Sequence, residues 1–329
     1  LYYTYKKEMK AIFFGLSFFI VNIIFLLQIL GAGQGFLADR FTYIAYFGLF
    51  FIIGYYIDRW LIQKPSHNVF FAGAISVYLG IFAYMTYQQS KIWTNSDTLW
   101  THVLKYYQNT TLPYGNRANY LRDQGRIREA LDDYNTTLSM KPNQPGAYNS
   151  RGKLFFSMAK GRDTLLLALD DYNKAIEYDS TEGEYWVNRG ATYARLGDLE
   201  KSIADFNKGL ALKPDHAVGY MNRSIIYQNL GKMDLAIQDI DSYLKLIPTN
   251  ADLWYEKGRA LRIVNKTDEA IKAYSQAIAL NNTKGFFYYE RAKAYAQLNM
   301  INEAKADVGS AINLGYKGDD PMFLQQMGY

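Results

Sequence analysis

The chain has 329 residues, a formal net charge of +5 and no cysteine, which excludes disulfides and thiolate metal sites. Seven of its 36 Lys/Arg and three of its 31 Asp/Glu lie in residues 1–92, so the rest of the chain carries 29 basic against 28 acidic residues. A near-neutral second part argues against a nucleic-acid partner, and three scattered histidines indicate neither a metal site nor a cofactor.

The first part of the chain, residues 1–92, contains three apolar stretches that are nearly free of charge. They are residues 11–30, 41–57 and 69–87. Each is about as long as a helix that crosses a bilayer. Five basic residues flank these stretches on one side, against Arg40 and Lys91 on the other, and basic loops favour the cytoplasm. We therefore predict a membrane domain with three transmembrane helices, and a chain that lies outside the cytoplasm, in the periplasm of a bacterium, from residue 93 onward.

Residues 93–110 predict a single helix between the membrane domain and the repeats that follow. Ser96 or Asp97 can cap its start. Counted back from those repeats, Ser96, Trp100 and Val103 occupy the twentieth, twenty-fourth and twenty-seventh places of a unit. We expect half a repeat that caps the N-terminal end.

Residues 111–316 repeat one pattern of 34 residues six times, with four extra residues in the second unit. The units start at Thr111, Pro145, Gly183, Ala217, Ala251 and Gly285. The eighth and twentieth places are always Ala, Gly or Ser, which predicts two helices that approach closely. In the third unit, the defining places hold Trp186, Gly190, Tyr193, Gly197, Phe206 and Pro214. The units are identified by this pattern as tetratricopeptide repeats, which implies an all-α, right-handed α-solenoid. Residues 317–329 predict a C-terminal cap whose helix begins at Pro321.

The sixth place of each unit faces the concave groove in that family. It holds Asn116, Ser150, Asn188, Asn222, Glu256 and Glu290. An Asn amide offers a donor and an acceptor, so such a column can pair with the backbone of an extended peptide, as in the similar repeats of O-linked N-acetylglucosamine transferases. The alternative is that these side chains are solvated or bond within their own helix. Two Glu at one end favour a basic segment of the bound peptide there.

Two further columns carry opposite charges. The seventh place holds Arg117, Arg151, Arg189, Arg223, Lys257 and Arg291, and the twenty-third holds Asp133, Asp171, Asp205, Asp239, Ala273 and Asp307. The unit without the Asp is also the unit without the Arg. This correlation predicts structural ion pairs between the two helices of each unit, within about 4 Å.

The segment ADRFTYIAYFGL resembles a motif of C-type membrane glycosyltransferases that carry C-terminal tetratricopeptide repeats, among them the transmembrane-and-tetratricopeptide O-mannosyltransferases. The matching residues are Ala38, Asp39, Arg40, Tyr43, Gly48 and Leu49, whereas Ala45 stands where the family has Pro. The resemblance implies a polyprenyl-phosphate sugar donor, with Arg40 near its phosphate. It also implies a catalytic residue upstream of this chain, so none is named here. The glycines at 31, 33 and 35 are read as helix breakers, not as a dinucleotide fingerprint.

Two functions remain open from the sequence. One is the C-terminal part of a membrane glycosyltransferase whose groove binds the protein or peptide acceptor. The other is a membrane-tethered scaffold that binds protein partners without catalysis.

Overall fold

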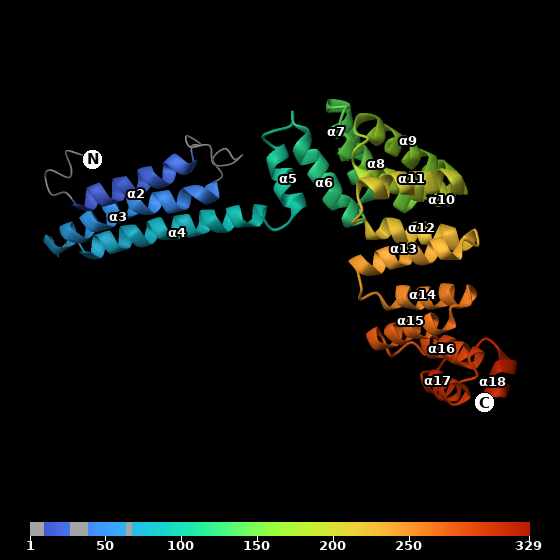
Figure 1. Ribbon diagram of the computed structural model, residues 1–329. Coiled ribbons are helices and arrows are strands. Elements are labelled where there is room, and N and C mark those ends of the chain that lie inside the picture. The colour runs from blue at the N-terminus through green and yellow to red at the C-terminus, as the bar shows by residue number, and fades with distance from the viewer. Residues whose placement is uncertain (1–9, 27–38, 64–67) are drawn as a thin grey trace. The chain divides into compact units, whose positions relative to one another are not determined.

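The computed structural model describes residues 10–26, 39–63 and 68–329 of the chain (Figure 1). All regular structure within these ranges is helical. The chain divides into two compact units, residues 1–92 and residues 93–329.

The first unit contains helices α2 (Lys10–Leu26), α3 (Asp39–Gln63) and α4 (Asn68–Ile92). Helices α2 and α3 approach most closely at Gly15 and Gly48. A Cβ atom added to either glycine would lie 2.4 Å from the carbonyl oxygen of the other, so no larger residue fits at this crossing. Most described side chains of α4 are exposed, including large apolar ones such as Phe70 and Tyr84.

None of the helices, over the described residues, combines the length and the apolar character needed to cross a membrane. The three predicted transmembrane helices are therefore not confirmed. Residues 27–30, which end the first predicted span, lie outside the described ranges.

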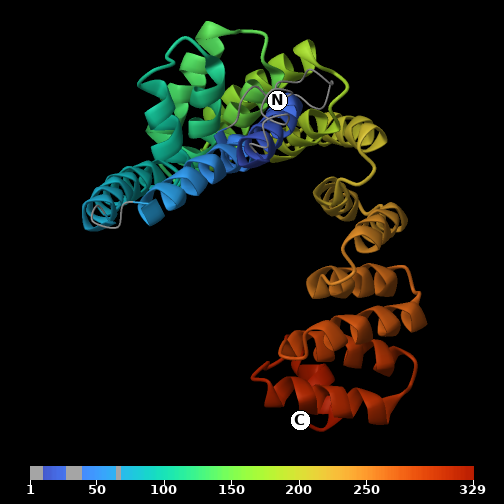
Figure 2. The same ribbon diagram turned by 90° about the vertical axis from the view of Figure 1, so that its left-hand side faces the viewer.

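The second unit begins with helix α5 (Ser96–Leu104), followed by six helix pairs that stack one after another (Figures 1 and 2). The first helices of the pairs are α6 (Thr111–Asp123), α8 (Pro145–Met158), α10 (Gly183–Leu196), α12 (Ala217–Asn229), α14 (Ala251–Ile263) and α16 (Gly285–Gln297). The second helices are α7 (Ile127–Met140), α9 (Arg162–Tyr178), α11 (Leu199–Leu212), α13 (Met233–Leu246), α15 (Thr267–Leu280) and α17 (Ile301–Asn313). The all-α solenoid predicted from the sequence is thus observed in this unit.

The small residues at the eighth and twentieth places lie where the two helices of a pair touch. All six residues at the twentieth place are fully buried. A Cβ atom added to Gly152 would lie 2.8 Å from the ring of Tyr172, and one added to Gly258 would lie 2.6 Å from the ring of Tyr274. The aromatic ring at the twenty-fourth place therefore fills the space that a larger side chain at the eighth place would need.

The four extra residues of the second unit fall mostly in α9. This helix has 17 residues, whereas α7, α11, α13 and α15 have 14 each. Leu165 and Ala168 of α9 are buried, while Leu166 and Leu167 are exposed. Because four residues make about one helical turn, the longer helix keeps its apolar face on the core.

Both ends of the solenoid carry a short helix. The sequence predicted Ser96 or Asp97 as the N-cap of α5, and this was wrong. The N-cap is Asn95, whose side chain accepts a hydrogen bond from the Thr98 amide at 2.9 Å while the Thr98 hydroxyl accepts one from the Asn95 amide at 3.3 Å. At the other end α18 (Pro321–Met327) begins at its proline. Its Phe323 and Met327 are buried against α16 and α17.

Candidate functional site

The six residues predicted to line the groove all lie on the first helix of their pair. Five of them are half-buried, and Glu290 is buried with 9% of its surface exposed. Five of the six fall into three groups along the solenoid. Asn116 and Ser150 line a common cavity, Asn188 joins a polar network with the preceding pair, and Glu256 and Glu290 are ion-paired. Asn222 makes no side-chain hydrogen bond to any described residue.

The cavity between α6 and α8 has a volume of about 280 Å³. Asn116, Asn119 and Ser150 lie in its wall, and Gly115 and Gly146 leave its floor open because they have no side chain. None of the eleven residues that line it is charged. The structure thus brings two of the predicted groove residues together at one hollow.

The network around Asn188 connects α8 with α10. The Asn188 amide donates to Asn149 Oδ1 at 2.9 Å, and both Asn149 and Lys153 donate to Glu184 Oε1, at 3.4 and 3.2 Å. Burial alone would raise the pKa of Glu184, but Lys153 and the amide of Asn149 outweigh it and hold the pKa below its usual range. Asn188 is therefore bonded within the solenoid, and a bound peptide would have to add to this network or exchange with it.

The two glutamates at the C-terminal end of the column have partners in the chain. Glu256 pairs with Arg259 at 3.2 Å. Glu290 pairs with Arg262 at 3.1 Å and with Lys293 at 3.4 Å. Because their charges are already compensated, the structure gives no support to the predicted preference for a basic peptide segment at this end.

The predicted Arg and Asp columns meet in all five units that contain both residues. Each Arg donates two hydrogen bonds to its Asp, from Nε and from one terminal nitrogen, at distances of 2.6 to 2.9 Å. The five carboxylates are 2% to 9% exposed. The prediction of structural pairs within each unit is confirmed.

Each of these arginines also reaches the helix before its own unit, which the sequence did not lead us to predict. The second terminal nitrogen donates to a side chain 16 residues earlier. The acceptors are Thr101, Asn135, Asn173, Asn207 and Ser275. Small polar residues recur at this place, the twenty-fifth of the preceding unit. That recurrence is the feature of the sequence from which the contact with the Arg could have been predicted.

The fifth unit replaces this arrangement by a different pair. Lys257 stands in place of the Arg and binds Asp241, at the twenty-fifth place of the preceding unit, at 2.7 Å. Ala273 stands where the other units have the paired Asp. The charge balance is thus kept, but the link within the unit is missing.

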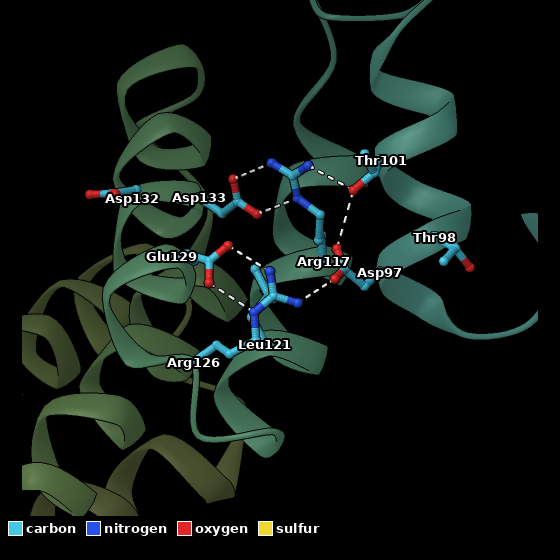
Figure 3. A pocket seen from close by; sticks show the side chains of 9 residues that line it. All are labelled: Asp97, Thr98, Thr101, Arg117, Leu121, Arg126, Glu129, Asp132 and Asp133. Atoms are coloured by element: carbon cyan, nitrogen blue, oxygen red, sulfur yellow. Dashed lines mark hydrogen bonds and ion pairs between the residues drawn. The ribbon is translucent and has the colours of Figure 1, made fainter.

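A cavity with a volume of about 510 Å³ lies between α5, α6 and α7 (Figure 3). Arg126 lies between Asp97 and Glu129, and Arg117 lies between Asp133 and the hydroxyl of Thr101. Burial alone would raise the pKa of Asp97, but the bonds from Arg126 and Thr101 hold it below its usual range. Each of these charged groups is paired with another one. The ion pairs around the cavity therefore connect the half-repeat to the first unit.

The predicted donor-phosphate contact, Arg40, lies in the first turn of α3, and its side chain is outside the part that the structure describes. The glycines at 31, 33 and 35 are also outside it. The role of Arg40 stays a prediction. Among the described residues, no group of three or more His, Asp and Glu could hold a metal ion.

Comparison with protein families matches three stretches of the solenoid. Residues 183–216 and 217–250 match the tetratricopeptide repeat, and residues 258–299 match the TPR repeat. The first two matches begin at Gly183 and Ala217, where helices α10 and α12 begin.

Two curated relatives are protein O-mannosyl-transferases of Mus musculus. The chain is 26% identical to TMTC1 over 143 residues, which is 37% of this chain and 15% of that protein. It is 37% identical to TMTC3 over 84 residues, which is 25% of this chain and 9% of that protein. The chain thus spans less than a sixth of the length of each relative.

Two solved structures share the fold. The C-terminal part of a TPR repeat-containing protein from Cytophaga hutchinsonii has a TM-score of 0.52 at 20% identity and covers 60% of this chain and 77% of that one. A chain of the APC/C hetero-tetramer Cut9–Hcn1 has a TM-score of 0.50 at 16% identity and covers 70% of this chain and 45% of that one. Residues 183–250 and 258–299 thus match models of tetratricopeptide repeats, and the chain is similar to the protein O-mannosyl-transferases TMTC1 and TMTC3 over a limited part of their length.

Proposed function

We propose that the solenoid binds an extended segment of an acceptor protein along its first helices, as part of a membrane glycosyltransferase that uses a polyprenyl-phosphate sugar. The observation that carries the binding function is the column of polar side chains at the sixth place. The side chains of Asn116 and Asn222 in this column make no hydrogen bond to any described residue, so their amides are available to a ligand.

The enzymatic part of the proposal draws on the similarity to protein O-mannosyl-transferases. It places catalysis outside this chain and gives the solenoid the task of holding the acceptor. The membrane part draws on the first unit, where Gly15 and Gly48 let two helix backbones approach closely and α4 exposes large apolar side chains. Close contacts of small residues are typical of helix pairs in membranes.

Replacing Asn116, Asn188 and Asn222 together by Ala is expected to weaken peptide binding tenfold or more. The amides of Asn116 and Asn222 can each make two hydrogen bonds to a peptide, that of Asn188 must share or exchange its bond to Asn149, and each bond to the peptide contributes about 0.5 to 1.5 kcal/mol. Binding is measured with fluorescent, uncharged dodecapeptides and the purified full chain. In the full-length protein, transfer of labelled mannose from polyprenyl-phosphate mannose to protein should fall together with peptide binding, while hydrolysis of the donor persists.

The control variant replaces three exposed asparagines outside the column, Asn109, Asn143 and Asn282, by Ala. It has the same change in composition and should bind and transfer like the unaltered protein. Unchanged binding by the groove variant would refute the proposed groove. Normal peptide binding together with no sugar transfer by the unaltered full-length protein would favour the non-catalytic scaffold instead.

The proposed location of the solenoid has a separate test. We expect protease added to intact bacterial spheroplasts to remove a C-terminal tag placed after Tyr329, because the distribution of basic residues puts residues 93–329 outside the cytoplasm. A cytoplasmic marker protein in the same sample should stay intact. If the tag survives until the membrane is lysed, the proposed orientation is reversed.

A further inference from the structure

The cavity between α6 and α8 differs from every later step of the groove. At the second and fifth places of the units, where the later units have larger residues, this step has Gly146 and Gly115. The fifth place elsewhere holds Asn149, Val187, Met221, Tyr255 and Tyr289, and the second place of the later units holds Glu184, Val218, Asp252 and Phe286. A Cβ atom added to Gly146 would meet nothing within 4 Å, and one added to Gly115 would meet only Thr137 Oγ1, at 3.9 Å. The hollow is therefore open space above the helix backbones.

The wall of this cavity is polar but uncharged. Gln144 donates to the Thr111 hydroxyl at 2.8 Å, and the Tyr134 hydroxyl donates to Asn119 Oδ1 at 2.7 Å. Burial raises the pKa of Tyr134, so its hydroxyl stays a neutral donor. A charged ligand group would find no counter-charge among the lining residues, and desolvating it there would be unfavourable.

Behind the wall, Arg122 lies within hydrogen-bond distance of Asn119 and Tyr134. Its guanidinium is paired with Asp123 at 2.8 Å, so it adds no uncompensated charge to the cavity.

Among the three amides in the wall, that of Asn116 leaves both its oxygen and its nitrogen to a ligand. The side chain of Asn116 makes no hydrogen bond to any described residue, whereas Asn119, Thr111 and Thr137 are engaged within the chain. A carboxamide can donate and accept at once, and a hydroxyl group is the small group that matches both functions. Leu112 at the rim is 64% exposed and can cover a methyl group beside that hydroxyl.

From this geometry we infer that the cavity is a subsite for a Ser or Thr side chain of the bound acceptor segment, with its hydroxyl paired to the amide of Asn116. The inference rests on the proposed peptide-binding function and adds a side-chain preference to it. The missing side chains at Gly115 and Gly146 let the peptide approach closely enough for this contact.

The test compares a fluorescent Thr-Gly dodecapeptide with its Val-Gly, Asp-Gly and Lys-Gly counterparts on the purified full chain. Thr and Val have nearly the same shape, so their difference isolates the hydroxyl. We expect the Thr peptide to bind about tenfold more tightly than the Val peptide, which corresponds to about 1.4 kcal/mol. The charged peptides should bind no better than the Val peptide.

Three variants locate this preference. Asn116→Ala should abolish it, whereas Asn282→Ala, at an exposed asparagine outside the groove column, should leave it intact. Gly115→Met should fill the hollow with the side chain that the fourth unit carries at this place, and should also abolish the preference. Its fold is checked by circular dichroism and thermal unfolding, since the site is open and Met is the better helix former.

The outcomes separate this inference from the proposed function. If all peptides bind equally well, or if Gly115→Met keeps the Thr preference, the subsite is refuted while peptide binding by the groove stands. If methyl mannoside displaces the probe and the Thr and Val peptides do not differ, the cavity is a carbohydrate site and the inference is wrong. If no peptide binds, both the subsite and the proposed peptide-binding function are refuted.

Discussion

Replacing Arg151 by Ala is expected to lower the free energy of unfolding by about 3 to 5 kcal/mol, because it leaves a buried carboxylate without its counter-charge. Arg151 makes two hydrogen bonds to Asp171, at 2.7 and 2.9 Å, and the Asp171 side chain is only 2% exposed. Burial raises the pKa of Asp171 even with Arg151 in place, so the charged form depends on this partner. The loss is measured by urea unfolding of the purified chain, followed by circular dichroism.

Lys257→Ala is the matched control, because Lys257 occupies the same place of the repeat. Its partner Asp241 is 41% exposed, so water replaces the lost contact and the expected change is below about 1 kcal/mol. A triple variant, Arg151→Lys with Asp171→Ala and Asn135→Asp, gives the second unit the arrangement of the fifth and should recover most of the loss. Equal effects of Arg151→Ala and Lys257→Ala would contradict the role assigned to burial.

Gly209→Leu is expected to destabilise the third helix pair by about 1 to 3 kcal/mol or more through overpacking. A Cβ atom at this position would lie 2.8 Å from the carbonyl oxygen of Gly183 and 2.8 Å from Val187 Cγ2. The first contact is with backbone, which cannot move aside without shifting α10. The change is measured as a lower midpoint of thermal unfolding.

The matched control for this variant is Gly115→Met, which also places a large apolar side chain at a glycine inside a helix. Its surroundings are open, so the gain of about 1 kcal/mol in helix propensity should leave its stability unchanged or higher. If both variants unfold at the same lower temperature, the close approach of α10 and α11 does not limit side-chain size at Gly209.

The periodic features of the fold could be predicted from the sequence because they depend on residue type at a fixed spacing. Small residues at the eighth and twentieth places required close helices, and the joint absence of Arg and Asp from the fifth unit indicated that these columns pair. Both expectations hold in the structure.

Features that depend on contacts between units could not be predicted in the same way. The second partner of each Arg comes from the preceding unit or half-repeat, 16 residues earlier, and a place that varies among Thr, Asn and Ser gives little signal in one sequence. Asn95 was missed as N-cap because Ser96 and Asp97 are equally good capping residues and only the backbone geometry decides among them.

The candidate site was predicted only in part for the same physical reason. The sequence indicates which residues occupy the sixth place, but not which of their amides form hydrogen bonds to neighbouring residues. Asn188 does so through Asn149, whereas Asn116 does not. The hollow at Gly115 and Gly146 needs both helices in place to be recognised, because each glycine alone indicates only a weak helix position.

The five Arg–Asp pairs and their bonds to the preceding unit limit how such a chain can grow by duplication. A segment of one period, cut at any point, contains one Arg, one Asp and one acceptor for the next unit, so copying it in register leaves no buried charge without a partner. The second unit tolerates an insertion between Arg151 and Asp171, which are 20 residues apart instead of 16, because the extra length is close to one helical turn. Gains or losses that are neither a full period nor close to a full turn would separate an Arg from its Asp and leave a buried carboxylate without its counter-charge.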